Sequence, residues 1–191
     1  MKNILILIIS FISISLYSQQ VYPLNAYIED VPTDSYFKDL DDELNPYIGL
    51  WKGNWNGKTV YLEFRKVKTY IGPIGKGIYK DKILGERKIV ETNGTVSIDR
   101  ISNFNEQSPE FNGLKEKFSN PSQKQLYFMT GICGKTANID ITFLDTAKIQ
   151  INLHLIYNPS YIDETCPYYN SVMQGNDYPI NFPKDIVLTK Q

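Results

Sequence analysis

Histidine and cysteine are scarce in this chain, and their scarcity excludes several kinds of catalytic and metal site. Of 191 residues, one is histidine, His154, and two are cysteines, Cys133 and Cys166. A single histidine excludes sites built from several imidazoles, and a Ser-His-Asp triad would have to form around His154. The alternation of its strand places His154 opposite Leu153 and Leu155, which favours an exposed strand histidine. The cysteines lack the C-x-x-C spacing of redox sites and the further ligands of a zinc site.

Motifs for acyl-transfer, phosphate and glycosidase chemistry are missing or weak. The sequence contains no Gly-x-Ser-x-Gly, the turn that presents a nucleophilic serine. The glycine-rich run 72–77 does not end in Gly-Lys-Ser/Thr, so a tight strand connection is favoured. Acid pairs such as Asp81 with Glu86, or Glu63 with Glu91, could meet across strands, but solvated strand faces explain them more simply. We therefore predict no enzymatic activity, no cofactor and no metal site.

Charge of one sign and long hydrophobic runs are also in short supply. The formal net charge is −1 at pH 7, which provides no electrostatic basis for binding nucleic acid or an anionic membrane. After residue 18, no segment is long and apolar enough to span a bilayer. The sequence does not identify a protein partner.

Residues 1–18 have the order of a secretory signal peptide. Lys2 precedes the apolar run Ile4–Ile12, and small polar residues follow as far as Ser18,. A membrane anchor is the alternative, but the run is short for a span of ~20 residues. We expect cleavage and export to the periplasm or the exterior. In that oxidising setting Cys133 and Cys166 are expected to form one disulfide, the alternative being two separate buried thiols.

Two segments precede the strand-rich part of the chain. Residues 19–33 show no clear period and contain two prolines, which predicts an extended arm. Asp34 and Ser35 can cap a short helix that Pro46 ends. The apolar face of this helix would comprise Tyr36, Phe37, Leu40, Leu44 and Tyr47,. Residues 34–191 are expected to form a single domain, because they are enough to bury one substantial core.

Strand patterns dominate from Ile48 onward. Fourteen tyrosines and nine phenylalanines favour strands over helices,. Residues 59–67 alternate between apolar and polar, Asn93-Gly94 predicts a tight hairpin, and Gly85 is expected to hinge two strands. Further strands are predicted at 125–130, 138–144, 148–157 and 186–189, with long loops at 103–122 and 158–183. Eight or nine strands without βαβ alternation predict an all-β fold, either an antiparallel meander closed into a barrel or a two-sheet sandwich.

The stretch YFKDLDDELNPYIGLWKGNWNGKTVYLEF, residues 36–64, resembles a family of uncharacterised secreted proteins from Bacteroidota. In that family a similar segment precedes a lipocalin-like β-domain. Further similarity lies in Tyr79-Lys80-Asp81, Leu84-Gly85-Glu86 and Thr92-Asn93-Gly94. The resemblance therefore implies a lipocalin-like (calycin-like) barrel, and the family brings no assigned activity.

A Gly-x-Trp motif carries the wider resemblance to lipocalins. Gly49 and Trp51 match it, and in lipocalins this tryptophan packs beneath the barrel against a basic residue near the last strand. Lys190 and Lys184 are the basic candidates here. The chain departs from lipocalins in lacking the usual arginine at that place and a Thr-Asp-Tyr turn.

A barrel of this kind implies an interior that the strand alternation lines with apolar side chains. Two tyrosines of an aromatic loop could lie at its mouth. The first hypothesis is a secreted or periplasmic protein that binds a small apolar or amphipathic molecule inside the barrel. The alternative is a structural or interaction domain whose barrel is filled by its own side chains. The candidate ligand contacts are Leu62, Phe64, Phe128, Ile141, Phe143, Leu153, Leu155, Tyr168 and Tyr169.

Overall fold

The computed structural model describes residues 19–26, 31–117, 120–129, 133, 136–156, 162–176 and 180–191. The chain divides into two units. The smaller comprises Met1–Leu40 with Thr69–Lys80, and the larger comprises Asp41–Lys68 with Asp81–Gln191. The predicted signal peptide, residues 1–18, lies outside the described residues. The domain boundary predicted at residue 34 falls inside the smaller unit.

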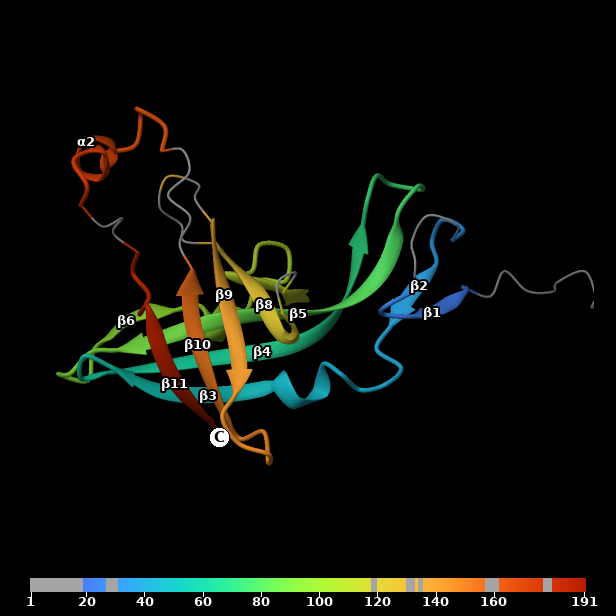
Figure 1. Cartoon of the computed structure of the whole chain (residues 1–191), viewed down its shortest axis with the longest axis horizontal. Coiled ribbons are helices and arrows are strands. Elements are labelled where there is room, and N and C mark those ends of the chain that lie inside the picture. Colours follow the sequence, from blue (N-terminus) through green and yellow to red (C-terminus); the bar gives the residue numbers. More distant parts are fainter. Residues whose placement is uncertain are drawn as a thin grey trace, which may run out of the picture. The chain divides into compact units, whose positions relative to one another are not determined.

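The larger unit is an antiparallel barrel of eight strands (Figure 1). Neighbours in the ring follow chain order, and the ring closes because β11 pairs with β3 and β7 pairs with β5. A short strand, β6 (Val96–Asp99), is added to β5 beside this ring. The predicted meander barrel of eight or nine antiparallel strands is thus confirmed. Its ring consists of β3 (Gly49–Trp55), β4 (Lys58–Ile71), β5 (Ile78–Val90), β7 (Phe111–Lys117), β8 (Asn120–Met129), β9 (Thr136–Phe143), β10 (Gln150–Ile156) and β11 (Asp185–Lys190).

The barrel core follows from the period-two alternation of its strands. On β4, Val60, Leu62 and Phe64 are buried while their neighbours are more exposed, which is the pattern of a strand with one face inside. On β5, Gly85 lets the backbone pass close to the core, because a Cβ there would lie 2.5 Å from Cδ1 of Phe64. The predicted hinge at Gly85 is wrong, since β5 runs unbroken from Ile78 to Val90.

Trp51 joins the first and last strands of the ring at one end of the barrel. Its side chain is fully buried and donates from Nε1 to the carbonyl oxygen of Tyr47 at 2.8 Å. Lys190 Nζ lies 5.3 Å from the centroid of the Trp51 ring and donates to the carbonyl oxygen of Pro46 at 3.0 Å. Gly49 has a φ of 124°, and a Cβ there would lie 3.2 Å from Cε of Lys190. The structure therefore places Lys190, and not Lys184, against the tryptophan of the Gly-x-Trp motif.

The helix predicted after Asp34 is wrong. Tyr36–Lys38 form a strand, β2, and the next regular element is a 3-10 turn, η1, at Asn45–Tyr47. Asp42 has a φ of 55°, a left-handed conformation that an α-helix cannot contain. The apolar residues have helical spacing, but strand pairing decides their conformation, because β2 forms hydrogen bonds with β1 (Val21–Pro23).

The smaller unit is built from short strand pairings and aromatic contacts. β1 pairs with β2 in parallel, and β2 pairs in parallel with the start of β5. The ring of Tyr22 stacks on Phe37 at a centroid distance of 5.6 Å. Tyr70 and Tyr79 meet edge to face at 5.1 Å. These contacts make Phe37 a buried residue of this unit.

Two segments predicted as loops contain regular structure. The predicted loop 103–122 includes β7 and the start of β8, and a 3-10 turn, η2 (Ile101–Asn103), lies at its beginning. The predicted loop 158–183 includes a short helix, α2 (Tyr169–Met173). β7 closes the ring of strands, because it pairs with both β5 and β8.

The two tryptophans of β3 provide a test of the buried contact at Trp51. Trp51→Phe removes the hydrogen bond to Tyr47 and part of the ring packed under Lys190, and we expect it to lower the free energy of unfolding by about 2–3 kcal/mol. Trp55→Phe, at a half-buried position of the same strand, should cost less than ~1 kcal/mol. Urea denaturation followed by circular dichroism measures both. Equal costs would show that Trp51 has no special place in the barrel.

Candidate functional site

The structure brings most of the predicted ligand contacts together inside the barrel. Phe143 is half-buried, with its ring 4.8 Å from that of Tyr47. Tyr168 and Tyr169 are not part of this group: Tyr168 is exposed, and Tyr169 packs against a separate small cluster of Ile162 and Cys166. The residues that are buried in the barrel are Leu62, Phe64, Phe128, Ile141, Leu153 and Leu155.

This interior is tightly packed. Leu62, Phe128 and Leu153 have no exposed surface at all, 0%, so each is covered by neighbouring side chains. A barrel of eight strands has an interior that side chains can just fill. A ligand would therefore have to displace side chains.

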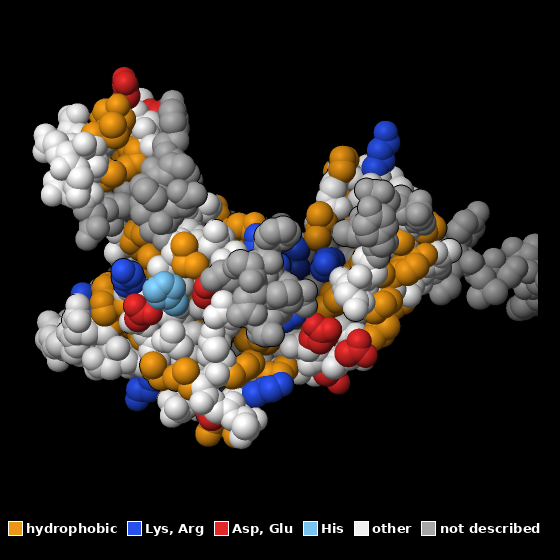
Figure 2. All heavy atoms as spheres, viewed as in Figure 1, with side chains coloured by type: hydrophobic (Ala, Val, Ile, Leu, Met, Phe, Trp, Pro, Cys, Tyr) orange, Lys and Arg blue, Asp and Glu red, His pale blue; other side chains and the backbone are white. Residues whose placement is uncertain are grey.

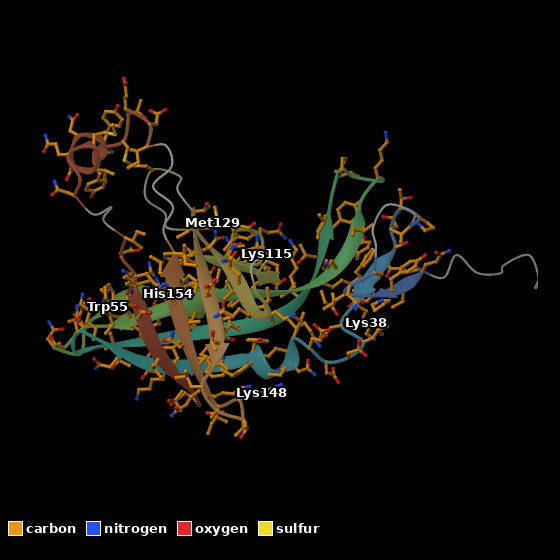
Figure 3. The ribbon with its side chains drawn as sticks, in the orientation of Figure 1. Lys38, Trp55, Lys115, Met129, Lys148 and His154 are labelled. Atoms are coloured by element: carbon orange, nitrogen blue, oxygen red, sulfur yellow. A yellow bond between two sulfur atoms is a disulfide. The ribbon has the colours of Figure 1, made fainter. Side chains whose placement is uncertain are left out.

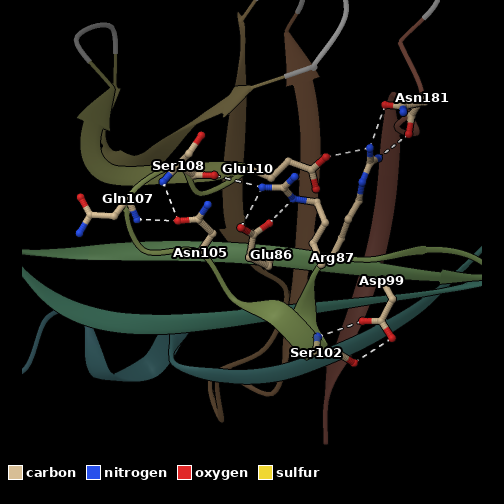
Figure 4. A network of polar contacts seen from close by, with 10 residues as sticks. Glu86, Arg87, Asp99, Ser102, Asn105, Gln107, Ser108, Glu110 and Asn181 are labelled. Atoms are coloured by element: carbon tan, nitrogen blue, oxygen red, sulfur yellow. Dashed lines mark hydrogen bonds and ion pairs between the residues drawn. The ribbon is translucent and has the colours of Figure 1, made fainter.

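A buried charged network lies within this apolar core (Figure 4). Arg87, on β5, is 1% exposed, and its Nη2 lies 2.9 Å from Oε1 of Glu110. The same nitrogen donates to Oδ1 of Asn181 at 2.9 Å, and Nη1 donates to the carbonyl oxygen of Asn181. The guanidinium carbon lies 5.3 Å from the ring centroid of Phe128 and 5.8 Å from that of Phe182. A cation thus sits among aromatic rings inside the barrel.

Strand geometry explains why Arg87 points inward. Gly85 and Arg87 are two residues apart on β5, so their side-chain positions share a face, and that face at Gly85 meets the ring of Phe64 and Cβ of Phe111. Glu110 directly precedes β7, where its carbonyl oxygen accepts from the amide of Met129 at 2.8 Å. Closure of the ring between β5 and β7 therefore places the two charged side chains together.

Three aromatic rings form the apolar surroundings of this pair. Phe111 stacks on Phe128 at 5.0 Å. Phe182, from the segment after α2, packs on Phe111 at 5.6 Å and on Phe128 at 5.1 Å. Its neighbour Asn181 is exposed. The guanidinium of Arg87 therefore lies directly beneath the exposed residue Asn181 at this end of the barrel.

A second ion pair occupies the opposite face of β5. Glu86 is 0% exposed, and Arg100 binds it through Nε at 2.5 Å and Nη2 at 3.0 Å. Arg100 also donates to the carbonyl oxygen of Ser108 at 3.0 Å, which holds the connection before β7. Three of the acids that the sequence offered as possible carboxylate pairs thus have basic partners. Glu86 pairs with Arg100, Glu63 pairs with Arg65, and Glu91 pairs with Lys58.

The electrostatics of Glu110 are unusual. Burial raises the pKa of its carboxyl from 4.5 to about 7, although the charges of Arg87 and Arg100 act in the opposite direction. Burial also lowers the pKa of Arg87, but a guanidinium remains charged at physiological pH. Nε of Arg87 and Oε2 of Glu110 have no hydrogen-bond partner among the described residues. The pair is therefore buried, incompletely satisfied and able to change its charge near neutral pH.

Other groups offer weaker sites. His154 (Figure 3) lies on β10 with Nδ1 2.6 Å from Oδ1 of Asp185, and both are exposed. Within the described ranges, no three His, Cys, Asp or Glu side chains are grouped so that they could hold a metal ion. On the face in Figure 2, acidic, basic and apolar side chains are interspersed. The Arg87–Glu110 pair is accordingly the strongest candidate.

The predicted disulfide between Cys133 and Cys166 is confirmed, with the two Cα atoms 5.6 Å apart. Cys166 and Ile162 form a small buried cluster, against which Tyr169, Val172 and Ile180 pack. The disulfide thereby attaches the segment that carries α2 to the chain between β8 and β9.

Fold and site together define a closed up-and-down β-barrel with a buried Arg–Glu pair at one end of its core. The chain belongs to a family of unknown function (DUF6705), whose family model matches residues 1–191. Comparisons with curated proteins and with solved structures found no match. Membership of a lipocalin-like family stays a prediction. In the part of the chain that the structure describes, no helix has the length and apolarity to cross a membrane.

The sequence patterns did not predict Arg87, Glu110 or Asn181 as site residues. One signal was available, because Arg87 continues the alternating face of Ile83, Gly85 and Ile89. Glu110 and Asn181 lay in predicted loops, where no pattern assigns them to the core.

The raised pKa of Glu110 predicts the pH dependence of stability. A carboxyl with a higher pKa in the folded state stabilises the fold most below pH 4.5, and this contribution is lost as the pH rises through 7,. We expect a loss of about 3 kcal/mol over this range. Glu110→Gln has no carboxyl to titrate and should not show this loss. The free energy of unfolding of the variant should therefore rise relative to that of the wild type between pH 5 and 8. Glu106→Gln, at an exposed position, is the control, and identical pH profiles for all three proteins would contradict the prediction.

The disulfide is expected to stabilise the protein by restricting the unfolded chain. Closing a loop of roughly 34 residues contributes about 3–4 kcal/mol in the chain-entropy model. The double variant Cys133→Ser/Cys166→Ser should lose this amount in denaturant titrations and keep the far-ultraviolet circular dichroism of the barrel. Reduced wild-type protein serves as the matched control. An unchanged midpoint in both would rule out the proposed contribution.

Proposed function

We propose that this is an exported binding protein that takes a small apolar or amphipathic molecule at the barrel end lined by Arg87, Glu110, Phe128 and Phe182. The observation that supports this most is the buried and incompletely satisfied Arg87–Glu110 pair among aromatic rings. Apolar rings with a few convergent polar groups are typical of small-molecule sites.

Energetics argue against a purely structural role for the pair. Replacing a buried ion pair by apolar residues of similar volume is often neutral or stabilising, so a barrel under selection for stability alone has little use for one. Charged groups with strongly shifted pKa values in a partly enclosed place are functional-site candidates. Glu110, with its pKa raised to about 7, meets this criterion.

The segment at Asn181 and Phe182 offers a route of access. Phe182 covers the rings of Phe111 and Phe128, whereas Asn181 beside it is exposed. Moving this one ring would uncover aromatic surface next to Arg87 without breaking a ladder of the barrel. Binding would then be driven by burial of apolar ligand surface at about 25 cal/mol per Å².

Export is supported by two observations of different kinds. The order of residues 1–18 is that of a signal peptide,. The Cys133–Cys166 disulfide is of a type that persists in oxidising compartments and is rare in the cytosol of mesophiles.

A second candidate function is a structural or interaction domain with a filled barrel. The complete burial of Leu62, Phe128 and Leu153 favours it. In that case the exposed residues of the disulfide-bonded segment, such as Tyr168 and Met173, would contact another protein. The two candidates differ in one measurable property, the binding of a small apolar molecule.

Decanol provides the test, because it is neutral and amphipathic. We expect it to raise the melting temperature of the wild type, with stabilisation of about 2.7 kcal/mol when its free concentration is 100 times Kd. Phe182→Ala should bind decanol more tightly, because the lost ring leaves space against Phe111 and Phe128. Val187→Ala, on the outer face of β11 at a half-exposed position, should behave as the wild type. If decanol stabilises neither the wild type nor Phe182→Ala, the filled-barrel alternative is correct.

A further inference from the structure

We propose that the molecule bound by the barrel carries a single carboxylate on an apolar tail, and that this carboxylate takes the place of the Glu110 carboxylate on Arg87. This inference rests on the proposed binding function and specifies the chemistry of the ligand. It is carried by the arrangement of donors, charges and rings around Arg87.

The donors of Arg87 are only partly used. Nη1 and Nη2 are engaged by the exposed Asn181, and Glu110 contacts Nη2 through one oxygen. Nε of Arg87 and Oε2 of Glu110 remain without a partner among the described residues. A guanidinium presents its N–H groups as a planar fork that matches the two oxygens of a carboxylate. A ligand carboxylate that accepted from Nε and Nη2 together would satisfy the donor that Glu110 leaves unused.

The charges around Glu110 fit one negative charge on the ligand. The charges that act on it are those of Arg87, Arg100 and Glu86. Arg100 and Glu86 neutralise each other through two hydrogen bonds. With Glu110 protonated, the remaining charge is the single positive charge of Arg87. A monoanionic carboxylate balances it, while a dianionic phosphate would leave one negative charge buried, which is costly.

The surroundings of the guanidinium fit an apolar tail. Phe128 and Phe182 present their rings to Arg87, and Phe111 stacks against Phe128. A molecule with its carboxylate on Arg87 would place its next carbon atoms among these rings. Both ends of such a ligand therefore meet groups of matching chemistry.

Displacement of Glu110 from Arg87 couples ligand binding to the uptake of a proton by Glu110. A carboxyl that loses its contact with Arg87 and gains a neighbouring anion binds a proton more tightly, while a ligand carboxylate of ordinary pKa stays ionised above pH 6. Since the pKa of Glu110 is about 7 before binding, the affinity should fall about tenfold between pH 6 and pH 8.

The experiment compares decanoate with decanol, which differ in the head group and share the tail. Calorimetric titration at pH 6 and pH 8 gives Kd for the wild type, Glu110→Gln and the double variant Arg87→Met/Glu110→Gln. The double variant avoids a buried glutamate without its partner. The matched control is Lys88→Met/Glu110→Gln, which removes a positive charge from the opposite face of the same strand, where Lys88 pairs with Asp99.

We expect the wild type at pH 6 to bind decanoate roughly 10- to 100-fold more tightly than decanol, the range of a charge-assisted hydrogen bond. Glu110→Gln should keep this preference at pH 8. The preference for decanoate over decanol should disappear in Arg87→Met/Glu110→Gln and persist in the control Lys88→Met/Glu110→Gln.

Other outcomes distinguish an error in the carboxylate assignment from an error in the proposed binding function. Equal affinities for decanoate and decanol in the wild type would leave the binding function in place and overturn the carboxylate assignment. A preference that persists without Arg87 would overturn it as well, because the anion would then bind elsewhere. If neither molecule binds to any variant, both the binding function and the carboxylate assignment are wrong.

Discussion

Closure of the strand ring is the constraint on which the rest of this structure depends. The ladder between β11 and β3 brings Lys190 over Trp51, and the ladder between β5 and β7 brings Arg87 to Glu110. Neither contact forms within one hairpin, because Trp51 and Lys190 come from the first and last strands of the ring, and β6 lies between Arg87 and Glu110 in the chain. The apolar core has the same origin, since alternating strands present one continuous inner face only when the sheet has no edges.

The two ends of this core are chemically different. Around Trp51, a basic side chain packs on the face of the ring and donates to a carbonyl oxygen, so its charge stays near the surface. Around Arg87, the charge is buried and its counter-ion has a pKa near neutrality. A cation on an aromatic face at a protein surface is a modest stabilising contact. A buried cation with an unused donor is a cost to stability, which is why the second end and not the first is the candidate site.

The sequence predicted the features that depend on regular alternation and missed those that depend on pairing. Period two along β4, β9 and β10 was enough to predict the barrel and most of its buried residues. β7 was missed, because a polar stretch with Gly113 and few apolar residues shows no alternation and becomes a strand through its partners β5 and β8. Helical spacing after Asp34 was misleading for a related reason, since pairing with β1 decides the conformation of Tyr36–Lys38. Arg87 and Glu110 were missed because charged residues are seldom buried.

The proposed site does not require an empty barrel, for a reason that lies in the polar contacts of Arg87. With Glu110 ionised, the charge of the guanidinium is balanced, but Nε and one carboxylate oxygen stay without partners. With Glu110 protonated, the partners are no better and the charge is unbalanced. Neither protonation state of the protein alone satisfies the buried cation, whereas an external carboxylate can. Because Asn181 is exposed, the proposed exchange would require movement of one short segment, and the packed interior beneath would serve as the rigid base of the site.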